Sequence, residues 1–88
     1  MKITVKREHI DNGIALSSTC CPIALAGKEL GLKDIWVTPR WMIYSLNDRM
    51  RSFTLPQTVQ EFVRRFDEGE HVTTISFDLP VLDSYGRV

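Results

Sequence analysis

The chain has 88 residues, 43% of them apolar and 25% charged, and eleven basic side chains balance eleven acidic ones. This composition is typical of one small folded domain and is too apolar for a disordered chain. A net charge of zero argues against a general nucleic-acid binder, and no run approaches the roughly 18 apolar residues of a membrane span. We therefore expect a single domain over residues 1–88, without membrane contact, cofactor or metal, in which residues 81–88 form a short mobile tail.

The N-terminal third is predicted to form a strand, a helical turn and a helix. Residues 2–6 alternate between polar and apolar side chains, as in a half-buried strand. A helical turn follows and ends at Gly13, which we expect in the left-handed conformation. The helix is expected over residues 20–30, with Thr19 as its N-cap and Pro22 in its first turn.

Three strands are predicted next. Residues 34–38, 41–46 and 49–55 are rich in strand-forming side chains. A turn signal at Asn47-Asp48 separates the last two segments, which we therefore expect to pair as a hairpin.

The clearest element is an amphipathic helix that opens at Pro56 and ends at Gly69. Glu61 and Arg65 lie four residues apart on its polar face, in the order that favours an ion pair. Residues 70–79 are expected to form the last strand. The order strand, helix, strand, strand, strand, helix, strand predicts an α+β fold: an N-terminal strand beside a small, mostly antiparallel sheet of about four strands, with two helices on one face.

Both cysteines, Cys20 and Cys21, fall at the predicted start of the first helix. A thiol at the positive end of a helix dipole tends to have a lowered pKa, so a reactive pair is one hypothesis. Against it, the spacing is not Cys-x-x-Cys, and His9 and His71 lie far apart, unlike the paired ligands of a zinc site. We favour a packing role for these cysteines. Without a disulfide framework, the reducing cytoplasm is the expected compartment.

Acidic residues gather at the end of the second helix, where negative charge is electrostatically unfavourable. The cluster consists of Asp67, Glu68 and Glu70. It indicates either a surface for a basic partner or a solvated turn, which is the interpretation we favour.

The predicted hairpin is the best candidate for an interface. It carries side chains of the types enriched at binding hot spots, namely Arg40, Trp41, Met42, Tyr44, Arg49 and Arg51. Both faces of its strands carry bulky apolar groups, and one layer of helices covers only one face. The other face is then covered by a loop or the tail, or it binds a protein partner or a second copy of the chain. Basic and aromatic side chains together also suit single-stranded nucleic acid, although the zero net charge makes nucleic acid an unlikely partner.

Three features occur together in this chain: an acidic-His-Ile turn at residues 8–10, the helix start Thr-Cys-Cys-Pro-Ile-Ala-Leu-Ala at residues 19–26, and the helix after Pro56 with its glycine stop. In this combination residues 3–80 resemble a group of small uncharacterised proteins of bacteriophages and bacteria. The resemblance implies a phage or mobile-element origin and carries over no catalytic residue. Small phage proteins of this size frequently bind and block a host enzyme or defence complex.

The function expected from these observations is that of a small non-enzymatic protein-binding module, an inhibitor or modulator of a host protein. Two other hypotheses stand beside it. One is a thiol-dependent enzyme or redox sensor that uses Cys20 or Cys21, and the other is a binder of single-stranded nucleic acid.

Overall fold

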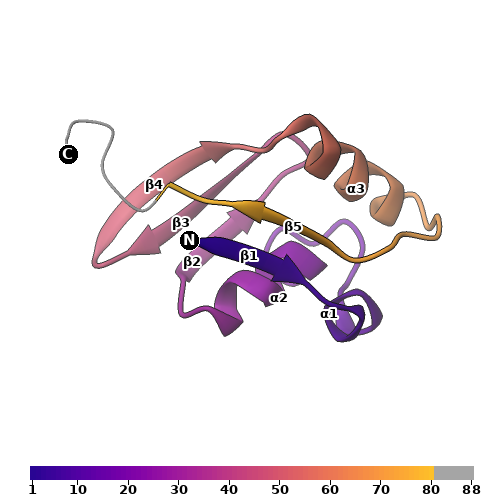
Figure 1. The fold of residues 1–88 in the computed structure, drawn as a ribbon, viewed down its shortest axis with the longest axis horizontal. Helices are drawn as coiled ribbons and strands as arrows, with labels where there is room; N and C mark the ends of the chain where they lie inside the picture. The colour runs from indigo at the N-terminus through magenta and orange to yellow at the C-terminus, as the bar shows by residue number, and fades with distance from the viewer. Residues whose placement is uncertain (81–88) are drawn as a thin grey trace.

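Five short strands and three helices follow one another in the computed structural model, which describes residues 1–80 (Figure 1). In chain order they are β1 (Lys2–Val5), α1 (Arg7–Asn12), α2 (Pro22–Glu29), β2 (Lys33–Val37), β3 (Trp41–Leu46), β4 (Arg49–Thr54), α3 (Gln57–Asp67) and β5 (Ile75–Asp78). The α+β class predicted from the sequence is confirmed. A third helix, α1, stands where only a helical turn was expected, and residues 81–88, predicted as a mobile tail, lie outside the described part.

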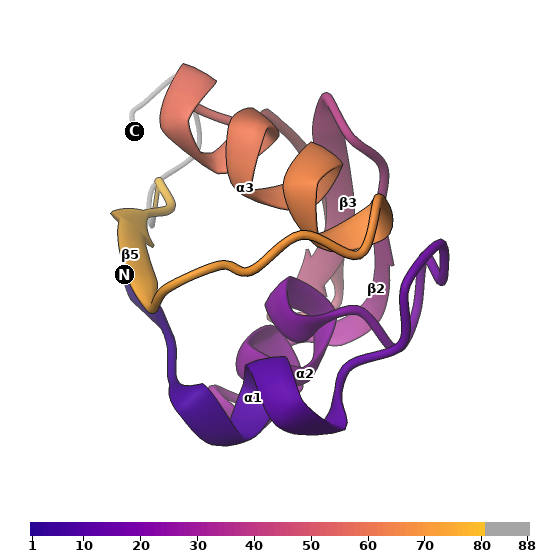
Figure 2. The same cartoon turned by 90° about the vertical axis from the view of Figure 1, so that its right-hand side faces the viewer.

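The strands form two antiparallel sheets, so the prediction of one sheet with both helices on one face is wrong. One sheet pairs β1 with β5, and the other has the order β2-β3-β4. Helix α2 packs against both β1 and β2 and lies between the sheets (Figure 2). The helix thus contacts one strand of each sheet.

The hydrophobic core lies between the two sheets. Alternate residues of β1 and β3 point into it and are fully buried, namely Ile3, Val5, Met42 and Tyr44. Helix α3 adds its apolar stripe, Val59, Phe62 and Val63. The rings of Phe53 in β4 and Phe77 in β5 stack with their centroids 6.3 Å apart, which joins the two sheets on the side away from α2.

The helix boundaries depart from the sequence prediction at one important point. Helix α2 begins at Pro22 rather than at residue 20, and Cys21, with extended backbone, occupies the N-cap position. The prediction of Thr19 as the cap is therefore wrong; its carbonyl oxygen instead accepts a hydrogen bond from Lys28 Nζ at 2.7 Å. Proline fixes its own φ at a helical value and lacks the N–H that a first-turn residue leaves unpaired, so the helix starts there.

The hairpin and the last helix follow the prediction closely. Strands β3 and β4 pair in register from Trp41 to Leu46, and the two turn residues, Asn47 and Asp48, have positive φ of 55° and 64°, as a two-residue hairpin requires. Strand β5 is shorter than the predicted 70–79, because its partner β1 has only four residues with which to pair.

Gly13 is needed for space rather than for a left-handed backbone. Its φ is −73°, so the expected left-handed conformation is wrong. A Cβ atom at this position would lie 2.7 Å from the ring of Pro22 and 2.9 Å from the carbonyl oxygen of His9. The end of α1 is therefore pressed directly against the start of α2.

We predict that Gly13→Ala lowers the free energy of unfolding by about 1–3 kcal/mol, since neither a proline ring nor a backbone carbonyl can rotate out of the way. Urea denaturation followed by circular dichroism measures the change. Asn12→Ala, one residue earlier and exposed, is the control and should shift stability by less than about 0.5 kcal/mol. Equal stability of the two variants would contradict the close contact.

Candidate functional site

The outer face of the three-stranded sheet carries both tryptophans of the chain. Trp41, Ile43 and Ser45 alternate along β3, so their side chains point to the same side of the sheet. Residues directly opposite each other share that side: Trp36 lies opposite Ile43, Thr54 opposite Trp41, and Met50 opposite Ser45. Trp36, Trp41 and Met50 are 51%, 38% and 61% exposed. We call this surface the tryptophan face; its ladder positions are Lys33, Trp36, Trp41, Ile43, Ser45, Met50, Ser52 and Thr54.

A bulge in β2 places Trp36 on this face. Lys33 pairs with Ser45 and Trp36 pairs with Ile43, so three steps along β2 match two steps along β3. The extra residue is accommodated at Asp34, whose φ is +53°. Without the bulge the alternation along β2 would put Lys33 and Trp36 on opposite faces.

The turn between β2 and β3 holds Trp41 in place. The Thr38 hydroxyl oxygen accepts hydrogen bonds from the backbone N–H groups of Arg40 (3.2 Å) and Trp41 (3.0 Å), and the Thr38 backbone N–H donates to the Trp41 carbonyl at 2.8 Å. A short turn with this many local bonds fixes the start of β3. These hydrogen bonds therefore fix the backbone from which the Trp41 side chain extends.

Four of the predicted interface residues lie on the other face. Met42 and Tyr44 are completely buried, so their side chains belong to the core and cannot contact a partner. Arg49 and Arg51 pair with Leu46 and Tyr44 in the ladder and share their inward side. Of the predicted hairpin residues, Trp41 lies on the tryptophan face and exposed Arg40 lies next to it.

Trp36 was not predicted as an interface residue. It sits between two buried residues in the segment Ile35-Trp36-Val37, which alone suggests only a strand with one side facing outward. That signal identifies Trp36 as the outward residue but cannot show that it shares a face with Trp41, because the shared face depends on the pairing of β2 with β3.

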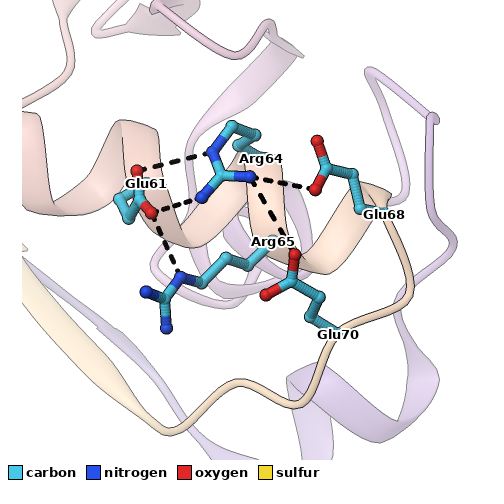
Figure 3. Close-up of polar contacts among 5 residues, drawn as sticks. All are labelled: Glu61, Arg64, Arg65, Glu68 and Glu70. Carbon is cyan, nitrogen blue, oxygen red and sulfur yellow. Dashed lines mark hydrogen bonds and ion pairs between the residues drawn. The ribbon is translucent and has the colours of Figure 1, made fainter.

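The acidic end of α3 is engaged in ion pairs within the chain (Figure 3). Arg64 binds Glu61, and its Nη1 lies 2.9 Å from Glu68 and 3.9 Å from Glu70. The predicted Glu61–Arg65 pair is confirmed, with Arg65 Nε 3.1 Å from Glu61. Hydrogen bonds from Arg64 and then Arg65 lower the pKa of Glu61.

The remaining acidic residue of this end, Asp67, accepts a hydrogen bond from the backbone N–H of Leu16 at 2.9 Å. Asp67, Glu68 and Glu70 therefore all have partners inside the chain. The two arginines in the last turn of α3 also offset the unfavourable negative charge there. This end of α3 is a weaker candidate for a basic partner than the sequence suggested.

The two cysteines sit in different environments and both are free. Cys21 is 4% exposed. Burial raises the pKa of its thiol, and the backbone N–H groups of Ala24 and Ile23 offset only part of this effect. The lowered pKa expected from the helix dipole is therefore wrong for Cys21. Cys20 lies before the helix, half-buried, and its backbone N–H donates to Ser17 Oγ at 3.0 Å.

One group of side chains in the described residues has the spacing of a metal site: Glu8, His9 and Glu29. His9 is buried, and its Nδ1 accepts a hydrogen bond from the backbone N–H of Lys6 at 2.9 Å. The neutral ring then carries its proton on Nε2, which lies 3.4 Å from Glu29. In a metal-bound histidine, the ring nitrogen that binds the metal carries no proton, and the other ring nitrogen donates its N–H to a second group. In His9, the nitrogen that faces Glu29 carries the proton and the other nitrogen accepts a hydrogen bond. His9 therefore acts as a cap at the start of α1. The cation that pairs with Glu29 is Lys6, whose Nζ lies 3.4 Å from the Glu29 carboxylate.

Among residues 1–80, no helix is long and apolar enough to cross a membrane. Comparisons of the chain with known protein families, with curated proteins and with solved structures found no match.

The difference between the cysteines leads to a labelling prediction. Iodoacetamide should alkylate Cys20 in the native protein and leave Cys21 unmodified, because only the thiolate reacts and burial keeps Cys21 protonated and shielded. Mass spectrometry of peptides counts the labels. In Cys20→Ser no native labelling is expected until denaturant is added, and rapid native labelling of that variant would show that Cys21 is accessible.

Tyr44 gives a stability prediction. Its hydroxyl is buried and finds no hydrogen-bond partner within residues 1–80, and burial raises its pKa. Tyr44→Phe removes the unpaired hydroxyl and should raise the free energy of unfolding by about 1 kcal/mol.

The same substitution has a predicted pH dependence. A pKa that is raised in the folded state gives stability that is present below the unfolded value, about 10, and is lost as the pH rises through the folded value. Denaturation at neutral pH and at pH values above about 10 should therefore show a smaller alkaline loss for Tyr44→Phe than for the wild type. A phenylalanine variant that is less stable at neutral pH would contradict the unpaired hydroxyl.

Proposed function

We propose that this protein is a small, non-enzymatic binding module that captures a protein partner on the tryptophan face. One observation carries the proposal: both tryptophans of the chain, together with Met50, are exposed on the same side of one sheet. Tryptophan is strongly enriched at binding hot spots and is seldom left exposed without a reason. The strand ladder and the Thr38 turn hold these side chains in place, so little entropy is lost when a partner docks.

The chemistry of the face favours a protein over a nucleic acid. Lys33 is the only charged side chain at the ladder positions of the face, and Arg40 stands at its border. Binding to a phosphate backbone depends on several cations that neutralise phosphates. Stacking on two tryptophans without those cations gives weak binding, so single-stranded nucleic acid is the second candidate rather than the first.

The size of the face favours a short apolar segment of the partner. Three strands spaced about 4.8 Å apart, with six residues of about 3.3 Å each, present about 300 Å². A standard interface takes about 800 Å² from each partner. A stable homodimer through this face alone would therefore need additional surface, whereas a helix or loop that inserts a few apolar side chains would cover the tryptophans.

The resemblance to small phage and bacterial proteins supports a host protein or defence complex as the partner, with this chain as its inhibitor or modulator. Both thiols are free, which suits a reducing compartment such as the cytoplasm. A thiol-dependent activity has less support: burial raises the pKa of Cys21, which leaves half-buried Cys20 as its one accessible thiol.

The double variant Trp36→Thr/Trp41→Thr tests the proposal. Threonine keeps the strand propensity, so the fold should be retained while the partner is lost. Immobilised wild-type and variant proteins are compared for capture from host lysate, and the captured protein is then purified and titrated by calorimetry. We expect affinity to fall at least about tenfold, as for the loss of hot-spot tryptophans.

Leu30→Thr is the matched control, because Leu30 is 43% exposed at the end of α2 and lies outside the tryptophan face. It should bind like the wild type. Wild-type affinity of the double variant, with an unchanged circular dichroism spectrum, would exclude the tryptophan face as the docking surface. Binding of a single-stranded oligonucleotide by the wild type, with steep salt dependence and with loss of binding in the double variant, would instead support the second candidate.

A further inference from the structure

A second feature of the fold, on the other sheet, is an incomplete strand. The last paired residues of the two-stranded sheet are Val5 and Ile75, and α1 begins only two residues after Val5. Residues 70–74 therefore run from the end of α3 to β5 with no strand beside them (Figure 1). The sequence predicts a strand over 70–79, and half of that strand lacks its partner.

The backbone of this segment has few hydrogen bonds. The Glu70 N–H donates to the Arg65 carbonyl at 2.9 Å, and the Val72 carbonyl accepts a long contact, 3.4 Å, from Arg7. Within the described chain, the N–H groups of residues 71–74 have no partner. A row of unpaired backbone donors and acceptors is a template for another strand.

An open cleft of about 320 Å³ runs between this segment and α3. Phe62 and Val72, both buried, and half-buried Ile75 form its apolar floor, and exposed Arg65 and His71 stand at its sides. Arg65 uses its Nε on Glu61, and its two terminal nitrogens point away from Glu68 and Glu70 (Figure 3). The cleft thus combines an apolar floor, unpaired backbone groups and available guanidinium donors.

We propose that residues 70–74 and this cleft are a second docking site, which receives an extended polypeptide segment as an added strand. Backbone N–H groups alternating with carbonyl oxygens are matched in spacing by another polypeptide backbone. Alternate side chains of the incoming segment reach the floor, so apolar residues are preferred there. The terminal nitrogens of Arg65 bind a carbonyl or carboxylate oxygen of the same segment. The cleft volume, near the low end of ligand pockets, suits a few side chains rather than a folded surface.

A displayed library of random linear peptides is the probe, because it offers extended segments of every composition. Selection on the wild-type protein should enrich peptides with alternating apolar residues. Bound peptide should slow amide hydrogen exchange at alternate residues of 71–74, Thr73 among them, because successive N–H groups of an extended segment point to opposite edges. This measurement needs no variant. Thr73→Pro removes one backbone donor and should weaken binding about tenfold or more, while Thr73→Val, which keeps the N–H, should bind like the wild type.

Three outcomes would overturn the site. They are the failure of any peptide to enrich, exchange protection that maps to β2 and β3 instead, and equal binding to Thr73→Pro with a native circular dichroism spectrum. Sedimentation showing a dimer whose amides at 71–74 are already protected would replace the peptide with a second copy of the chain. The double variant Trp36→Thr/Trp41→Thr should bind the selected peptides normally, so failure of this site is distinguishable from failure of the tryptophan face.

Discussion

The close fit of helix α2 between two sheets is the constraint on which the rest of the structure depends. A Cβ atom at Gly27 would lie 2.8 Å from Ile35 in β2, and one at Gly13 would meet the ring of Pro22. The helix can approach β1 and β2 this closely because the residues that it buries, Ile23 apart, are small or compact. The Cys-Cys-Pro-Ile-Ala-Leu-Ala stretch is therefore best understood as a packing element, in which buried Cys21 fills space at the helix start.

This packing decides which surfaces remain open. With α2 and α3 on the inner side of β2-β3-β4 (Figure 2), one face of that sheet is buried, and on the other face Trp36, Trp41 and Met50 are exposed. The bulge at Asp34 then brings Trp36 onto the open face beside Trp41. An antiparallel sheet covered on one side normally carries polar residues on the other. Two tryptophans and a methionine on that face are a departure from this rule, which is the observation that supports the proposed docking surface.

Local features of the fold were predictable from the sequence, and features that depend on distant contacts were not. The hairpin strands, the turn at Asn47-Asp48 and the Glu61–Arg65 pair depend on patterns within a few residues, and all three are found in the structure. The separation into two sheets depends on where α2 packs, which no local pattern contains. The placement of Trp36 and Trp41 on the same outward face depends on the register between strands and on one bulge. For the same reason Met42 and Tyr44 could not be told apart from Trp41 by residue type alone.

The two open surfaces have one common cause. A chain of this length buries only about 60% of the surface that its unfolded form exposes, so it has too few elements to cover every sheet face and every edge. Here the uncovered parts are the outer face of one sheet and the unpaired backbone beside β5 in the other. The sheets are held apart by α2, so an occupant of one surface does not have to displace an occupant of the other (Figure 2). The surfaces also differ in chemistry, one with aromatic side chains and the other with backbone groups beside Arg65. A partner that engages both would gain from the fixed distance between them, since the second contact forms within an existing complex.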